Sequence, residues 1–187
     1  MSNSLRNTFV LAGLFVALSP LTEADARPIH EGTPYLGIQH SSLSLTADRT
    51  ISSASPDMVD LRAGYFLFDY MALEARYGTG VKNDRLVRAD QGRTKVSVDR
   101  YAGAYGAFHF PFATTSSVYL FGGLSHFEAE FEREDETFED SDEGLSWGFG
   151  YQINTGDQFG LNLEYSRFLD ESGYRVVGYT VGAQVYF

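Results

Sequence analysis

The sequence contains no cysteine among its 187 residues. A chain without cysteine forms no disulfide and offers no thiolate ligand to a metal ion, whichever compartment it occupies. Its stability must therefore come from backbone pairing and side-chain packing.

Long apolar runs are scarce as well, since the one clear run is Thr8–Leu18 near the amino end. Arg6 precedes it, and the small-x-small signal Ala24-Asp25-Ala26 follows it. This order predicts a secretory signal peptide over residues 1–26, cleaved after Ala26. A retained membrane helix is the alternative, but such a helix needs about 20 apolar residues. The predicted mature domain is residues 27–187.

Positive charge is limited to 14 Lys and Arg against 25 Asp and Glu, a formal net charge of −11. An acidic chain of this kind makes nucleic acid an unfavourable partner. Aromatic residues make up 15% of the chain, and 19 residues are glycine. That combination is unusual in a helical domain and is typical of strands with aromatic residues on one face and small residues on the other.

Apolar and polar residues alternate with a period of two after residue 33, which is the strand pattern. In the last segment, Tyr174–Phe187, valine, tyrosine and phenylalanine alternate with glycine, threonine and glutamine. Ser117–Phe127 is apolar on both faces, so its orientation stays open. The seven earlier predicted strands are Tyr35–Ser41, Val59–Leu67, Met71–Tyr77, Tyr101–Phe110, Ser117–Phe127, Leu145–Ile153 and Phe159–Tyr165.

The predicted connections alternate in length. Short turns are expected at 68–70, 111–116 and 154–157. Longer loops are expected at 42–56, 79–97 and 128–143, with a brief one at 170–173. Eight strands joined in this way predict an all-β fold, an eight-stranded antiparallel up-and-down transmembrane β-barrel with periplasmic short turns. A soluble lipocalin-type barrel is the alternative. Lipid is favoured by the aromatic apolar face, the polar opposite face and a sequence that stops inside a strand.

The last eight residues, 180–187, resemble the carboxy-terminal assembly signal of outer-membrane proteins, with Thr180, Gly182, Val185 and Phe187 as its signal positions. Residues 73–80, 100–105 and 161–168 resemble the OmpA-like outer-membrane β-barrel family, also called small porin-like proteins. The resemblance covers residues 33–187. It implies export to the Gram-negative outer membrane, with lipid, lipopolysaccharide and the barrel assembly machinery as partners. It implies no particular activity.

Five charged residues fall on the polar face that would line the lumen: Asp60, Arg62, Glu74, Arg76 and Glu164. Eight strands leave an interior just wide enough for side chains to fill. Because buried charges must pair, these residues predict a structural network of ion pairs that plugs the barrel. A gated ion path is the alternative.

Two of the predicted loops carry opposite charge. The segment between residues 127 and 144 contains ten acidic residues and one basic residue, Arg133. This composition predicts a solvated loop whose like charges repel each other. Carboxylates suit Ca²⁺, but no Asp-x-Asp-x-Asp-Gly spacing indicates a defined site. Basic residues dominate 79–97 and could meet lipopolysaccharide phosphates or pair with the acidic loop across the barrel mouth. An extracellular ligand could bind through 79–97 and 128–143.

Catalytic signatures are weak. The nearest matches are His40 with Ser41 and Ser42, and His126 with Ser125 and Glu128, and neither forms a recognisable catalytic pattern. The sequence therefore predicts no enzyme, no catalytic or metal-binding residues and no cofactor. Two functions remain: a structural or surface-interaction barrel, and a small-solute or ion pore.

The signal-peptide prediction is tested by amino-terminal sequencing of the protein purified from the outer-membrane fraction. We expect the mature chain to begin at Arg27, because cleavage follows the small residue Ala26. A mature chain that still begins at residue 1 would contradict it.

Overall fold

The computed structural model describes residues 31–47, 55–82, 84–88, 92–133, 136–168 and 174–187. The elements in this part of the chain are all strands, and together they form one sheet. Their bounds are β1 Pro34–Ala47, β2 Asp57–Phe68, β3 Met71–Lys82, β4 Asp84–Arg88, β5 Gly92–Ala113, β6 Ser116–Arg133, β7 Glu136–Thr155, β8 Phe159–Phe168 and β9 Tyr174–Tyr186.

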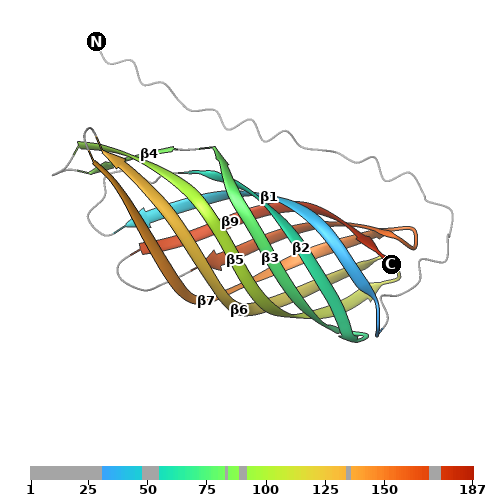
Figure 1. Cartoon of the computed structure of the whole chain (residues 1–187). Helices are drawn as coiled ribbons and strands as arrows, with labels where there is room; N and C mark the ends of the chain where they lie inside the picture. The colour runs from blue at the N-terminus through green and yellow to red at the C-terminus, as the bar shows by residue number, and fades with distance from the viewer. Residues whose placement is uncertain (1–30, 48–54, 83, 89–91, 134–135, 169–173) are drawn as a thin grey trace, which may run out of the picture.

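Every strand pairs antiparallel with its neighbours, and β1 pairs with β9. The sheet closes where β3 pairs with β5, from Met71↔Phe108 to Gly78↔Tyr101. The short strand β4 pairs with β5 and prolongs the β3–β5 hairpin beyond the closed part. Eight strands therefore form a closed barrel, which Figure 1 shows as an elongated cylinder whose strands are strongly tilted relative to its long axis. The predicted eight-stranded antiparallel barrel is confirmed.

No helix among the residues that the structure describes is long and apolar enough to cross a membrane.

The two faces of the barrel wall differ sharply in composition. Large apolar side chains point outward and stay exposed, among them Leu61, Leu124 and Phe149, while polar and aromatic side chains point inward and are buried. The orientation of 117–127, open from the sequence, is settled: Val118 and Leu120 face outward, and Tyr119 lies inside. This inside-out distribution is what a barrel surrounded by lipid requires.

The two ends of the barrel differ. At one end, here called the turn end, two- or three-residue turns at 69–70, 114–115 and 156–158 join the strands. Gly156 adopts a φ of 73° in the last of these turns, a conformation that glycine adopts without strain. At the other end, the hairpin end, β5, β6 and β7 run far beyond the closed part of the wall (Figure 1).

The prediction of long loops is wrong for most of 128–143 and 79–97. Strands β6 and β7 stay paired from Ser116↔Ile153 to Arg133↔Glu136, so the acidic segment is a β-hairpin. The basic segment is likewise made of β3, β4 and β5. Residues 128–133, Glu-Ala-Glu-Phe-Glu-Arg, alternate as a strand does, although their high charge density is typical of a loop. The predicted loop 42–56 is strand up to Ala47, and the predicted connection 170–173 lies outside the described residues.

The predicted signal peptide, residues 1–26, also lies outside the described residues. Its cleavage stays a prediction.

Glycine makes room inside the wall for the aromatic rings of neighbouring strands. Gly64 on β2 faces inward, and a Cβ built there would lie 2.1 Å from Cζ of Tyr35 on β1. Likewise, a Cβ built at Gly150 on β7 would lie 2.3 Å from Cζ of Tyr119 on β6. Large inward rings are therefore seated against strands that carry no side chain at the contact.

We expect Gly64→Ala to lower the free energy of unfolding by about 1–3 kcal/mol, because the new methyl group overlaps the Tyr35 ring. The measurement is the urea midpoint of the refolded protein in detergent micelles. Gly106→Ala is the matched control, since a Cβ at Gly106 meets nothing within 4 Å. Equal effects of the two substitutions would contradict the seating of the ring.

Candidate functional site

Four charged side chains meet at the centre of the lumen, and we call them the central quartet: Arg62 on β2, Glu74 and Arg76 on β3, and Glu164 on β8. Strand alternation points all four inward, but only the register brings them together. Arg62 lies directly opposite Arg76 in the β2–β3 ladder. Two like charges opposed in this way repel each other, so carboxylates must lie between them.

The central quartet forms a closed ring of ion pairs. Glu74 bridges the two arginines on their own side of the lumen: its Oε1 contacts Nη2 of Arg62, and its Oε2 lies 2.7 Å from Nη2 of Arg76. Glu164 bridges them from the opposite wall, with its Oε1 2.7 Å from Nη1 of Arg62 and its Oε2 2.8 Å from Nη1 of Arg76. None of these side chains is more than 3% exposed.

Neutral donors complete the coordination of the two carboxylates. Tyr35 donates its hydroxyl hydrogen to Glu74 over 2.6 Å, and Tyr119 donates to Glu164 over 2.6 Å. The side-chain amides of Gln39 and Asn162 also donate to Glu164 Oε1, over 3.1 and 3.2 Å. These donors satisfy lone pairs that the guanidinium groups leave free, as buried carboxylates require.

Aromatic rings flank the guanidinium groups. Arg62 Cζ lies 5.4 Å from the ring centroid of Tyr35 and 5.5 Å from that of Tyr119. Arg76 Cζ lies 4.9 Å from Tyr105 and 4.5 Å from Phe121. Cation–π attraction therefore adds to the ion pairs in a setting from which water is largely removed.

On the turn side of the central quartet, the lumen is filled by rings and amides. His109 stacks on Tyr119 at 4.8 Å between centroids and lies 5.1 Å from Phe66. Gln184 donates to the amide oxygen of Gln152 over 3.1 Å, and both amides contact the Tyr186 hydroxyl. Side chains thus occupy this part of the lumen.

On the hairpin side, a second aromatic layer covers the central quartet. Tyr101, Phe127 and Phe168 pack with centroid separations of 4.7 to 5.7 Å. The hydroxyl groups of Tyr101 and Tyr105 are 2.7 Å apart. The charged centre is therefore enclosed by packed rings on both sides.

The five residues predicted for the lumen all lie inside, but they are not equivalent. Asp60 is 3% exposed, yet it takes no part in the ring of ion pairs, and its Oδ2 has no hydrogen-bond partner among the described residues. Sequence reasoning missed Tyr35, Tyr119, Gln39 and Asn162 as partners of the carboxylates. Their inward strand position was a usable signal, but their contacts cross the lumen and depend on register.

The predicted assembly residues lie on or beside the last strand. Thr180 faces the lumen, 2.8 Å from the Ser41 hydroxyl, and Gly182 lies between β1 and β8. Val185 is half-buried, and Phe187 is 72% exposed just after β9. Recognition of these four residues by the barrel assembly machinery stays a prediction.

The two histidine matches do not form a catalytic arrangement. His40 and Ser42 are both exposed on the outer face. His126 lies 3.2 Å from Glu128 and 3.2 Å from Glu143, while Ser125 faces inward and contacts Ser146 at 2.5 Å. Among the described residues, no group of three or more histidine or acidic side chains is placed to hold a metal ion.

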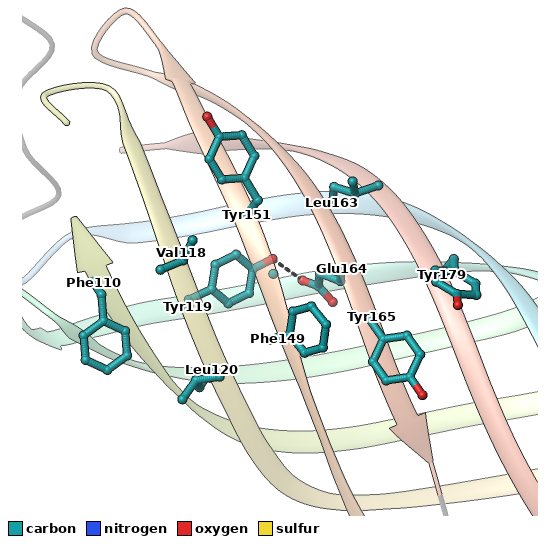
Figure 2. Close-up of a pocket in the computed structure, with 11 residues that line it drawn as sticks. Phe110, Val118, Tyr119, Leu120, Phe149, Tyr151, Leu163, Glu164, Tyr165 and Tyr179 are labelled. Carbon is teal, nitrogen blue, oxygen red and sulfur yellow. Dashed lines mark hydrogen bonds between the residues drawn. The ribbon is translucent and has the colours of Figure 1, made fainter. Parts of the chain in front are cut away.

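The outer wall across β5 to β9 carries an apolar groove. Figure 2 shows Leu120, Phe149 and Tyr165 along it, while the Tyr119 hydroxyl reaches Glu164 on the lumen side of the same wall. The lining is almost entirely apolar. The groove thus belongs to the surface that faces lipid, and it lies behind the central quartet.

Comparison with known proteins supports this architecture. The family model for the outer membrane protein β-barrel domain matches residues 8–187. The chain therefore belongs to the outer-membrane protein β-barrel family, and it is an outer-membrane barrel. A comparison with curated protein sequences finds no match.

Solved structures show the same fold at low sequence identity. Neisserial surface protein A is 17% identical, with a TM-score of 0.66, and the alignment covers 84% of this chain and 100% of that chain. The attachment invasion locus protein Ail of Yersinia pestis is 18% identical, with a TM-score of 0.62 and coverage of 84% and 99%. The amino-terminal barrel of Pseudomonas aeruginosa OprF is 15% identical, with a TM-score of 0.55 and coverage of 81% and 97%.

We expect Glu164→Gln to lower the free energy of unfolding by about 3–5 kcal/mol, because it removes one carboxylate that neutralises two buried guanidinium groups. The measurement is the urea midpoint in micelles. Glu128→Gln is the control: its ion pair with Arg100, at 3.5 Å, is partly exposed, so we expect a loss of about 0–1 kcal/mol. Similar losses in both variants would mean that the central quartet does not hold the barrel together.

Proposed function

We propose that this protein is a non-enzymatic outer-membrane barrel that does not conduct, and that it acts through the charged hairpins at its hairpin end. The observation that carries the first part is the closed ring of the central quartet, enclosed by aromatic layers on both sides. A hydrated path for ions through the lumen would require the ion pairs of the central quartet to break, which would leave buried charges without their partners. The alternative, a small-solute pore, is therefore disfavoured.

Planar lipid bilayers test this proposal directly. We expect the refolded wild-type protein to insert without discrete conductance steps. Buried side chains fill the lumen along its length, from Tyr186 on the turn side to Phe168 on the hairpin side. Insertion is verified independently by co-flotation of the protein with lipid vesicles. Regular conductance steps that scale with the number of inserted molecules would favour the pore.

The second part of the proposal concerns the two hairpins. Strand register places basic and acidic positions of neighbouring strands opposite each other, Lys95 with Glu132 and Arg100 with Glu128. Opposite charges at paired positions stabilise a sheet, so this arrangement supports a stiff extension. We infer that the extension lies outside the cell, because short turns at the other end are typical of the periplasmic side.

A charged extension suits ligands of complementary charge. Ail, which shares the fold, has been crystallised in complex with the heparin analogue sucrose octasulfate. For this chain, the β4–β5 hairpin with Arg85, Arg88, Arg93 and Lys95 is the candidate contact for a polyanion, and the β6–β7 hairpin is the candidate contact for a basic partner.

Shortening the β6–β7 hairpin tests the surface role. Residues 130–139 would be replaced by Asn-Gly, which joins Ala129 to its register partner Asp140. We expect the urea midpoint to stay unchanged, and cells carrying this variant to adhere less to polylysine-coated glass. Adhesion to heparin-coated glass is the internal control and should not fall. Unchanged adhesion to polylysine would contradict a role for this hairpin.

A further inference from the structure

Among the residues that the structure describes, three carboxylates and two guanidinium groups are buried in the lumen. The central quartet balances its own charges, so Asp60 is in excess. Of the described histidines, His109 is the buried one, and it stacks among aromatic rings on the turn side, where a charged imidazolium would be poorly solvated. A buried carboxylate without a counter-charge costs several kcal/mol, so either a proton or a bound cation must neutralise it.

Asp60 belongs to one inward-facing row that crosses five strands. The register runs from Gly78 on β3 through Asp60 on β2, Gln39 on β1 and Gly182 on β9 to Asn162 on β8. Both glycines leave space that the others occupy: a Cβ at Gly78 would lie 2.5 Å from Cβ of Asp60, and one at Gly182 would lie 2.6 Å from Oδ1 of Asn162. The three polar side chains therefore gather along this row.

The oxygen atoms of this row are unpartnered. Gln39 and Asn162 both direct their amide nitrogens to Glu164 Oε1, which accepts hydrogen bonds and cannot donate them when ionised. Their amide oxygens consequently point elsewhere, and neither has a hydrogen-bond partner among the described residues. Asp60 Oδ2 has none either. All three residues are at least nine-tenths buried.

We propose that the lumen binds one monovalent alkali cation between Asp60 Oδ2 and the amide oxygen of Gln39, with the amide oxygen of Asn162 as the next ligand along the row. Carboxylate and amide oxygens are the ligands that hard cations prefer. One excess negative charge calls for a single positive charge, and one carboxylate is too few for a tight divalent site. The role is structural, and it is separate from conduction and from the hairpins.

The test compares the unfolding temperature of the refolded full chain in neutral detergent micelles, in NaCl, KCl and choline chloride at equal concentration. Choline is too large to enter the filled lumen. We expect the wild-type protein to unfold about 3 °C higher in NaCl or KCl than in choline chloride, because a ligand bound only by the folded state raises its stability.

Two variants assign the effect to the site. Asp60→Asn should lose the difference between sodium and choline, while unfolding in choline at or above the wild-type temperature, since the excess charge is gone. Asp99→Asn removes the same charge from an exposed position and should keep the difference. If Asp60→Asn does not fold, the wild-type series still overturns the proposal when the unfolding temperature is the same in all three salts.

Other outcomes overturn the proposal. A wild-type unfolding temperature that is the same in all three salts would show that no alkali cation is bound. Dependence on pH instead of on the cation would mean that a proton neutralises Asp60. A sodium effect retained in Asp60→Asn would place the ion elsewhere.

Discussion

The structure depends on one constraint, which is that two arginines directly opposed on neighbouring strands must be neutralised inside a narrow, largely dry lumen. Glu74 neutralises the two arginines from β3, the strand that also carries Arg76. Glu164 neutralises them from the opposite wall of the barrel. Because β8 supplies Glu164, the ion pairs are complete only when the cylinder has closed. Closure of the sheet and burial of charge are thus coupled.

The coupling explains why charged and polar residues lie beside aromatic rings in the interior of this barrel, while apolar residues cover its exterior. Contact with lipid favours the outward Leu, Phe and Tyr side chains. Because lipid offers no hydrogen bonds to the backbone, backbone hydrogen bonding between strands must be complete in the part that spans the membrane. The lumen is packed by rings seated on glycines, as Tyr35 is on Gly64, and by the ion pairs of the central quartet.

Much of the fold follows from the sequence, because a period of two assigns each residue to a face without knowledge of its partners. That reasoning places Asp60, Arg62, Glu74, Arg76 and Glu164 inside. It cannot say that four of them form a ring while Asp60 stays apart, since this depends on the stagger between strands. It also mistakes the acidic hairpin for a loop, because charge density and strand alternation coexist there in 128–133.

The central claim is that the four charges act as one unit, and a double-mutant cycle between Arg76→Met and Glu164→Leu measures this most directly. Removing both partners leaves the pair of Arg62 with Glu74 intact, whereas either single change leaves one member of the Arg76–Glu164 ion pair without its partner. The account predicts that the double variant loses much less unfolding free energy than the sum of the two single losses. Losses that simply add, within about 0.5 kcal/mol, would contradict it.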